Sequence, residues 1–381
     1  MHVELTEEQE MIRAMAREFA DKEVRPIAAE IDRDARFPRE TVRRMGALGL
    51  LGMTIPPAYG GSGADAVSYV VAMEEIAKAC ASHAVILSVN NSLYCEPVYK
   101  YGSEEQRQRL LVPFVTGEKI GCFALTEPQA GSDATNQTTL AVRAGDHYVV
   151  NGRKVFVTSG RESSAALVFC QTDRGQGHGG ISVLIIESGT PGFLVPKVEE
   201  KLGLRASDTA EFLFEDCRVP VANRLGDEGL GIKIAMSSLD SGRIGIAAQA
   251  LGIAAGAYEL AVAYARERRS FGVPIGQHQM VQWMLADMAT AIDAARLLTL
   301  RAAALKDAKK PFGTAAAMAK LFASETAMKA TTDAIQVHGG YGYIKDFQVE
   351  RYFRDAKITQ IYEGTSQIQK LVIARSLLGG A

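Results

Sequence analysis

The spacing of hydrophobic residues changes twice along this chain of 381 residues. It is helical in the N-terminal part, becomes that of short β-rich runs from about Ile120, and returns to helical from about Gly229. The last part predicts three long helices, at residues 230–268, 278–306 and 313–337, with glycine and proline in the connections. Because long helices with short connections form up-and-down bundles, the chain is predicted to consist of an α, a β and a second α region.

Short local signals mark the ends of the predicted elements. Thr6 with Gln9, and Ser103 with Gln106, have the spacing of capping boxes and predict helix starts. Asn151-Gly152 lies between two β-rich runs and predicts a type I′ hairpin, because both residues accept a positive φ. Turn residues at short intervals are typical of an antiparallel barrel or sandwich, with further strands predicted at residues 166–170, 181–186 and 211–214.

The overall composition excludes several classes of protein. A formal net charge of −2 and 47% hydrophobic residues predict a globular protein with a sizeable core and no affinity for nucleic acid. The start of the chain is acidic and lacks the layout of a signal peptide. Five scattered cysteines show neither a C-x-x-C pair nor zinc spacing, so we expect buried or half-buried free thiols, no metal site and a cytoplasmic location.

Two stretches imitate features of other protein classes. Residues 244–265 are apolar enough to suggest a membrane span, but Gln249 and Glu259 interrupt them and most of the others are small. A buried bundle helix is therefore favoured, and no membrane is expected. Residues 175–180 match G-x-G-x-x-G, but a dinucleotide-binding turn leads into a helix and a strand is predicted to follow here. We interpret residues 175–180 as a hairpin loop.

Glu363 is a candidate general base. It lies between the bulky residues Ile361 and Tyr362 on one side and the turn Gly364-Thr365-Ser366 on the other. Apolar neighbours desolvate a carboxylate and raise its pKa towards working pH, which suits proton abstraction. The alternative is an acid that complements the dipole of the helix predicted after it.

Two loops are candidate ligand sites. Residues 123–133 leave a strand and offer hydroxyls and backbone N–H groups, which can hold the edge of a heterocycle and a phosphate. Residues 336–342 follow the third long helix, and their glycines permit close approach of the backbone to a ligand. The simpler interpretations are an ordinary turn for the first loop and a glycine helix stop for the second.

Taken together, these segments resemble the acyl-CoA dehydrogenase family over essentially the whole chain. The resemblance rests on three motifs in the family's order, at residues 124–133, 336–343 and 351–365. It implies an α+β multidomain fold with a helical N-terminal domain at residues 1–118, a middle antiparallel β-barrel at 119–225 and a C-terminal four-helix bundle at 226–381.

The resemblance also implies an activity. Members of the family bind FAD non-covalently and oxidise a fatty acyl-CoA to the trans-2-enoyl-CoA, passing electrons to an electron-transferring flavoprotein. By resemblance, Glu363 removes the α proton while the β hydrogen leaves as hydride to flavin N5. The enolate-like charge is held by the N–H of the same glutamate and by a flavin ribityl hydroxyl. A homotetramer, a dimer of dimers, is expected because each FAD site draws on two subunits.

Individual site residues follow from the same resemblance. The family usually has Trp where this chain has Phe156, which can stack on a flavin but has no indole N–H. Glu363 is the implied catalytic residue, and Ser132, Asp240, Arg243 and Gly364 are the implied substrate contacts. The implied cofactor contacts are Phe123, Leu125, Thr126, Phe156, Thr158, Arg268, Phe271, Gln279, Gln336, Val337, Gly339, Gly340, Thr365 and Gln367.

The substrate class is a finer question. Residues 88–93 and 242–250 resemble most the short-chain, butyryl-type members, and Gln249 either shortens the acyl cavity or is a polar residue of helix packing. The open alternatives are a short-branched-chain enzyme, an acyl-CoA oxidase, a biosynthetic relative acting on another acyl thioester, a non-catalytic flavin-containing relative that binds DNA, and a helical scaffold without cofactor.

Overall fold

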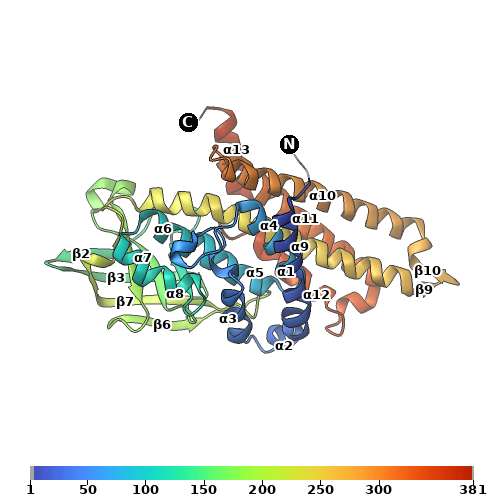
Figure 1. Ribbon diagram of the computed structural model, residues 1–381. Coiled ribbons are helices and arrows are strands. Elements are labelled where there is room, and N and C mark those ends of the chain that lie inside the picture. The colour runs from blue at the N-terminus through green and yellow to red at the C-terminus, as the bar shows by residue number, and fades with distance from the viewer. Residues whose placement is uncertain (1–3, 380–381) are drawn as a thin grey trace.

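The α, β, α order expected from the sequence is confirmed in the computed structural model, which describes residues 4–379. In Figure 1 the sheet lies at one end of the molecule and the long helices run away from it towards the small β9–β10 hairpin. The N-terminal helices pack between these two ends. This arrangement determines which candidate site residues can meet within one chain.

The N-terminal region is built from short helices. Both predicted capping boxes are confirmed, with the backbone N–H of Gln9 3.2 Å from Thr6 Oγ1 and that of Gln106 3.2 Å from Ser103 Oγ. The helices are α1 (Glu7–Phe19), α2 (Ala28–Arg33), α3 (Arg39–Ala47), α4 (Ala66–Ala79), α5 (Ala81–Ser88), α6 (Glu96–Tyr101), α7 (Glu104–Leu110) and α8 (Val112–Val115), with a π-helical turn at Val89–Cys95.

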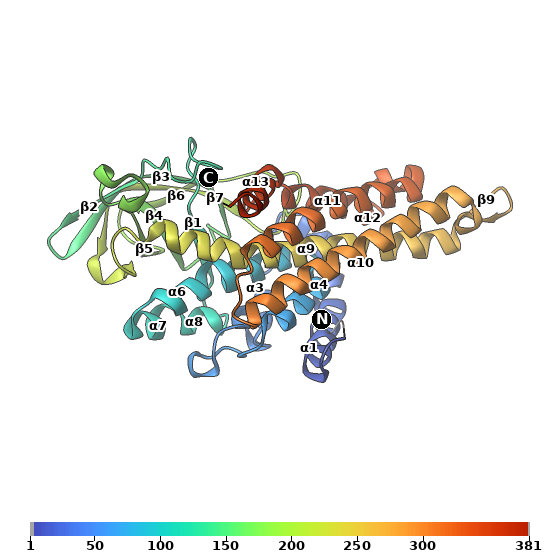
Figure 2. The same ribbon diagram turned by 90° about the horizontal axis from the view of Figure 1, so that it is seen from above.

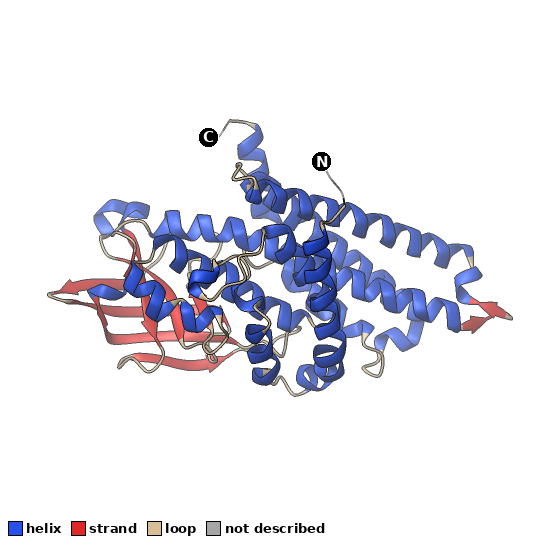
Figure 3. Cartoon of the chain, in the orientation of Figure 1, coloured by secondary structure: helices blue, strands red, loops and turns tan. Residues whose placement is uncertain are grey.

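The middle region is a single sheet of eight strands, seen in red in Figure 3. Its strand order is β6-β7-β3-β2-β4-β5-β8, with β1 paired to β4. Most neighbours are antiparallel as expected, but β1 and β2 each run parallel to β4. The strands are β1 (Gly121–Ala124), β2 (Leu140–Ala144), β3 (His147–Thr158), β4 (Ala165–Gln171), β5 (Ile181–Glu187), β6 (Phe193–Val198), β7 (Thr209–Pro220) and β8 (Arg224–Leu225).

The hairpin predicted at Asn151-Gly152 is wrong. Both residues lie inside β3, which runs on without a turn and pairs with β7 on both sides of a β-bulge. Asn151 bonds across the sheet, accepting from the Asp216 N–H at 2.8 Å. A Cβ at Gly152 would stand 2.6 Å from Thr139 Cα, so this glycine serves close packing rather than chain reversal. The chain reverses earlier, at Gly145-Asp146 between β2 and β3.

The loop interpretation of residues 175–180 is confirmed. A short 3₁₀ segment, Arg174–Gly180, connects the antiparallel strands β4 and β5, and no helix follows it. The five cysteines are also as expected, since all are buried and free.

The C-terminal region contains the three long helices, each within one residue of its predicted limits at both ends. α9 packs on α4, α10, α11 and α12, as Figures 1 and 2 show from two directions. The elements are α9 (Gly231–Glu267), β9 (Arg269–Ser270), β10 (Val273–Pro274), α10 (Gln279–Asp307), α11 (Gly313–His338), α12 (Val349–Thr359) and α13 (Ser366–Leu377).

Small residues place α9 at the centre of this packing. A Cβ at Gly252 would stand 2.5 Å from Ala77 Cβ on α4, and one at Gly256 would stand 2.7 Å from the Tyr352 ring on α12. Within residues 4–379, α9 is the one helix long and apolar enough to cross a membrane, and 72% of its apolar window is buried inside the protein. Core helices pass the same test, and α9 packs as one.

Candidate active site

Glu363 lies in the loop between α12 and α13, in an unusual backbone conformation. Its φ is 52° and that of the next residue, Gly364, is 90°, so two consecutive residues are left-handed. Thr365 then caps α13, its side chain accepting from the Ile368 N–H at 3.2 Å. A non-glycine residue with positive φ costs conformational energy and persists only where its surroundings hold it.

The Glu363 carboxylate is buried against α9. A Cβ at Gly242 would stand 2.0 Å from Glu363 Oε2, so the absence of a side chain at Gly242 makes room for the carboxylate. Within the described residues, neither carboxylate oxygen has a hydrogen-bond partner. Burial raises the pKa of Glu363 to about 7, although the nearby cations Lys320 and Arg243 act in the opposite direction.

Two side chains missed by the sequence reasoning bind the backbone of the Glu363 loop. Lys320 on α11 is fully buried, and its Nζ donates to the Gly364 carbonyl at 2.7 Å. Gln369 Nε2 donates to the carbonyls of Glu363 at 3.1 Å and Gly364 at 2.9 Å. The available signal was a lysine on the same stripe of α11 as Ala316 and Ser324, which are also buried.

Arg243, one of the implied substrate contacts, lies beside the same carboxylate. It is buried, and it donates to Asp240 Oδ1 at 2.6 Å, which joins two implied substrate residues one turn apart on α9. Its Nε is buried without a partner within the described residues. Arg243 therefore lies beside Glu363 and is bonded to Asp240, and the role of both as substrate contacts stays a prediction.

Gln249 closes the other side of this region. It lies two turns along α9 from Gly242, is fully buried, and donates to the Ala81 carbonyl at 2.8 Å. Its Oε1 accepts a hydrogen bond from the hydroxyl of Tyr362. Gln249 therefore ties α9 to the residue that precedes Glu363 in the chain.

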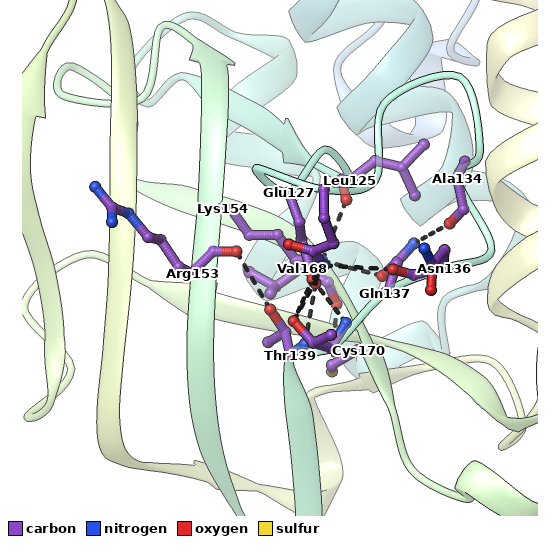
Figure 4. Close-up of polar contacts among 12 residues, drawn as sticks. Leu125, Glu127, Ala134, Asn136, Gln137, Thr139, Arg153, Lys154, Val168 and Cys170 are labelled. Atoms are coloured by element: carbon purple, nitrogen blue, oxygen red, sulfur yellow. Dashed lines mark hydrogen bonds and ion pairs between the residues drawn. The ribbon is translucent and has the colours of Figure 1, made fainter.

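The loop after β1 is held by a buried ion pair, shown in Figure 4. Lys154 Nζ on β3 lies 2.7 Å from Glu127 Oε1, and both side chains are excluded from solvent. Glu127 also accepts from the N–H groups of Thr138 at 2.7 Å and Thr139 at 3.0 Å. Lys154 donates in addition to the Leu125 carbonyl at 3.2 Å. These bonds fix both ends of the loop between β1 and β2.

Several implied cofactor contacts meet along this loop. The Val155 N–H donates to the Thr126 carbonyl at 2.9 Å, which places the loop beside the bulge of β3. Phe156 projects from that bulge with a φ of 57° and is 66% exposed. Thr158 follows on the same strand, and Phe123 and Leu125 lie at the end of β1. Ser132, an implied substrate contact, is exposed on the loop.

A second group of implied cofactor contacts lies at the far end of the long helices. A cavity of about 440 Å³ is lined there by residues that include Arg268, Val337, Gly339 and Gly340. Gly339 has a φ of 61°, and a Cβ there would meet no atom within 4 Å, so the loop is open to a ligand. The Arg268 guanidinium suits an anionic diphosphate, and the lack of side chains at Gly339 and Gly340 lets the backbone approach it. Gln336, Phe271 and Gln279 are exposed near this cavity.

The chain does not bring the two groups together. Arg243 and Arg268 lie about 25 residues apart along α9, or roughly 38 Å at about 1.5 Å per residue. Figure 2 shows the sheet and the β9 end at opposite extremes of the molecule. The implied cofactor contacts on β1, β3 and the loop between β1 and β2 are therefore separate within one chain from those at the far ends of α9 and α11.

Three sequence-family profiles match in succession along the chain. They are described as the acyl-CoA dehydrogenase N-terminal domain at residues 6–118, the middle domain at 122–217 and the C-terminal domain at 229–378. The chain is 54% identical over 374 residues to a short-chain specific acyl-CoA dehydrogenase of Clostridium acetobutylicum, covering 98% of this chain and 99% of the relative.

Solved structures agree with these matches. Butyryl-CoA dehydrogenase from Megasphaera elsdenii aligns with a TM-score of 0.97 at 45% identity, covering 99% of this chain and 100% of that chain. A chain in a structure described as the electron transferring flavoprotein of Acidaminococcus fermentans aligns with a TM-score of 0.98 at 52% identity, with the same coverage. The resemblance and the fold class expected from the sequence are thereby confirmed.

Proposed function

Because the chain belongs to the acyl-CoA dehydrogenase family over all three of its regions, we propose that it is an FAD-dependent dehydrogenase of short-chain acyl-CoA. The product is the trans-2-enoyl-CoA, and the electrons pass to an electron-transferring flavoprotein. The observation that carries the proposal is the buried, unpartnered carboxylate of Glu363 in a site built by Gly242, Arg243 and Lys320.

Glu363 takes the α proton of the thioester. The α C–H is a weak acid, so a base with a pKa near neutral pH and no competing hydrogen bond is suited to receive the proton. The backbone N–H of Glu363 donates no hydrogen bond within the described residues and is therefore available to the thioester oxygen, where the enolate charge develops. Arg243 and Lys320 add positive charge beside that centre.

The residues of this chain fit FAD in two places. Phe156, Thr126 and Thr158 offer an aromatic face and two hydroxyls beside the loop after β1, which suits an isoalloxazine ring. The cavity at Arg268 and Gly339 suits the diphosphate. Bound FAD supplies the acceptor for the β hydrogen as hydride. By resemblance to the family, Trp is usual at this position. Phe156 keeps an aromatic face that can stack on the flavin but lacks the indole N–H.

The separation of these two places supports an oligomer. A neighbouring subunit that brings its own Arg268 end to the sheet region of the first completes each site, as expected for a dimer of dimers. Exposed apolar side chains at that end are the natural contacts, since Phe271 is 97% exposed, Met280 65% and Trp283 64%. Thr365 and Gln367 lie at the start of α13, directly after Glu363, and are also proposed to contact the cofactor.

Gln249 is proposed to limit the length of the acyl chain. Its hydrogen bonds to Tyr362 and the Ala81 carbonyl hold it in place two turns beyond Gly242 on the face of α9 that meets Glu363. Replacing it with Ala removes this obstacle and is expected to raise kcat/KM for C6 and C8 substrates about tenfold relative to C4. An unchanged chain-length profile of Gln249→Ala would leave Gln249 a packing residue.

The decisive experiment is anaerobic reduction of the purified protein by a panel of straight and branched acyl-CoAs from C4 to C8. We expect the fastest flavin bleaching with butyryl-CoA. Reoxidation by an electron-transferring flavoprotein but slowly by air then separates a dehydrogenase from an oxidase. Absence of bleaching by every member of the panel would overturn the proposal.

The cellular location of the protein and its domain limits are also part of the proposal. We propose a cytoplasmic enzyme that binds neither membrane nor nucleic acid, consistent with a net charge of −2 and with its bacterial relative. The domain limits after residues 118 and 225 stay predictions, which limited proteolysis and mass spectrometry of the fragments can test.

A further inference from the structure

We propose that Lys320 and Gln369 are positioning residues that clamp the carbonyls of Glu363 and Gly364 and thereby aim both the carboxylate and the N–H of Glu363 at the thioester. The inference rests on the proposed function and extends it to two side chains that do not touch the substrate. Its basis is a set of three hydrogen bonds onto one strained turn.

The strained turn needs to be held from outside. Glu363 and Gly364 are both left-handed, a conformation that a glutamate rarely adopts. The turn has no regular pattern of backbone hydrogen bonds. The first backbone N–H after Gly364 that donates to a backbone carbonyl is that of Ser366, which bonds the Gln360 carbonyl at 2.9 Å. Side chains from elsewhere must therefore fix its two middle carbonyls.

Lys320 holds the turn from the core side. Its side chain is fully buried on α11, and a buried ammonium is costly unless it is well bonded. It donates to the Gly364 carbonyl at 2.7 Å, and Glu363, Arg243 and Glu325 are the charged groups that influence it. A hydrophobic residue would satisfy packing alone at lower cost, so the ammonium is expected to have a specific task.

Gln369 holds the same turn from α13. Its Nε2 bonds both carbonyls, at 3.1 and 2.9 Å, while its own Oε1 is buried without a partner within the described residues. The amide is thus oriented entirely by the turn. A Cβ at Gly364 would stand 2.7 Å from this Nε2, so Gly364 is needed for the approach.

The three hydrogen bonds from Lys320 and Gln369 act by fixing the position of Glu363. Fixing the peptide that follows Glu363 fixes its Cα, from which both the carboxylate and the free N–H project. A shift of about 1 Å between reacting groups can cost about 100-fold in rate. Loosening the clamp is therefore expected to slow proton abstraction much more than it weakens substrate binding.

The experiment compares Lys320→Met, Gln369→Leu and the double variant with wild type. The matched control is Lys329→Met on the same helix, whose exposed side chain pairs with Asp333 at 2.6 Å. Five quantities are measured on the holoenzyme. They are the FAD content, the melting temperature, the Kd for butyryl-CoA, the limiting rate of anaerobic flavin reduction and the ultraviolet absorbance of bound acetoacetyl-CoA enolate.

We expect each single variant to keep FAD, to bind butyryl-CoA within about threefold of wild type, and to lose about 30- to 100-fold in limiting rate together with most of the enolate absorbance. The double variant is expected to be little slower than the worse single one, because both side chains act on the Gly364 carbonyl. Lys329→Met is expected to match wild type.

Two results would overturn the inference. One is that both single variants show the limiting rate and the enolate absorbance of the wild-type enzyme, in a preparation where butyryl-CoA does reduce the wild-type enzyme. The other is loss of FAD and of thermal stability in both single variants, which would make the residues structural. A wild-type protein that no acyl-CoA reduces would instead refute the proposed function.

Discussion

A single glycine and a single glutamate define the centre of this protein at the residue scale. Gly242 leaves the space that the Glu363 carboxylate fills, and the burial that results raises the pKa of that carboxylate to about 7. Any side chain at position 242 would collide with Oε2. The position of the proposed base thus depends on Gly242, which leaves room because it has no side chain.

Glu363→Gln is expected to fold and bind FAD but to lose bleaching by butyryl-CoA by at least about 10³-fold, because an amide cannot take the α proton. Anaerobic stopped-flow absorbance measures this loss. Wild-type bleaching in the variant would remove Glu363 as the base.

The same substitution is expected to stabilise the fold above pH 7. Because the pKa of Glu363 is higher in the folded chain than its ordinary value of 4.5, ionisation costs stability as pH rises from about 4.5 to about 7. Gln carries no such cost, so the variant is expected to gain roughly 3 kcal/mol at pH 8 and little at pH 4.5. Urea unfolding at the two pH values checks the difference, and equal gains at both would contradict it.

The rate of flavin reduction in the wild-type enzyme is expected to rise with pH and level off above about 7, because only ionised Glu363 accepts the proton. Lys320 and Arg243 lower the pKa of this carboxylate against the effect of burial, and Glu363 in turn raises the pKa values of the nearby Tyr69 and Tyr362. The pH dependence of the limiting rate measures it. A flat profile from pH 5 to 9 would contradict the role of a buried base.

At the scale of elements, the loop between β1 and β2 owes its shape to one buried ion pair. Burial of Glu127 would raise the pKa of its carboxyl, but the Lys154 ammonium and four further hydrogen bonds lower it to about 2. The loop that carries Thr126 and Ser132 is therefore anchored to β3 by a buried charge pair as well as by hydrogen bonds.

Lys154→Met is expected to destabilise the fold by about 3–5 kcal/mol and to release FAD, because it leaves the Glu127 carboxylate buried and unpaired. The double variant Glu127→Gln with Lys154→Met is expected to recover part of that loss. Urea unfolding and the flavin absorbance of the purified protein measure both effects. A double variant as unstable as the sum of the singles would argue against the pair acting as a unit.

At the scale of the whole molecule, the two groups of implied FAD contacts lie apart. Phe156 lies on β3 of the sheet and Arg268 directly follows the 37-residue α9, whose β9 end is opposite the sheet. The proposed completion of each site by a second subunit rests on this separation and links cofactor binding to assembly.

Trp283→Glu is expected to give a smaller species with little bound FAD, because a carboxylate at an apolar contact of the far end opposes association. Met11→Glu on α1, where the side chain is 67% exposed, is the control and is expected to leave the assembly unchanged. Light scattering coupled to size-exclusion chromatography gives the mass. An active, FAD-loaded monomer would contradict the composite site.

Much of the fold could be predicted because its signals are local. The long helices matched their predicted limits to within a residue, since the 3.6-residue period acts over a few neighbours. The capping boxes at Thr6 and Ser103 are equally local, and they correctly predicted the starts of α1 and α7. The hairpin at Asn151-Gly152 failed for the complementary reason. The same dipeptide that suits a turn also suits a bulge, and pairing with β7 on both sides decided between them.

The sequence by itself determined the order of the regions, the long helices and, through three motifs, the family and Glu363 as the candidate base. Only the tertiary structure decided what surrounds that carboxylate: Gly242 from α9, Lys320 from α11 and Gln369 from α13. These residues are up to 127 positions apart in the chain, and no local pattern records a contact between them. Burial, and with it the raised pKa that makes a base, is a property of packing and not of sequence neighbours.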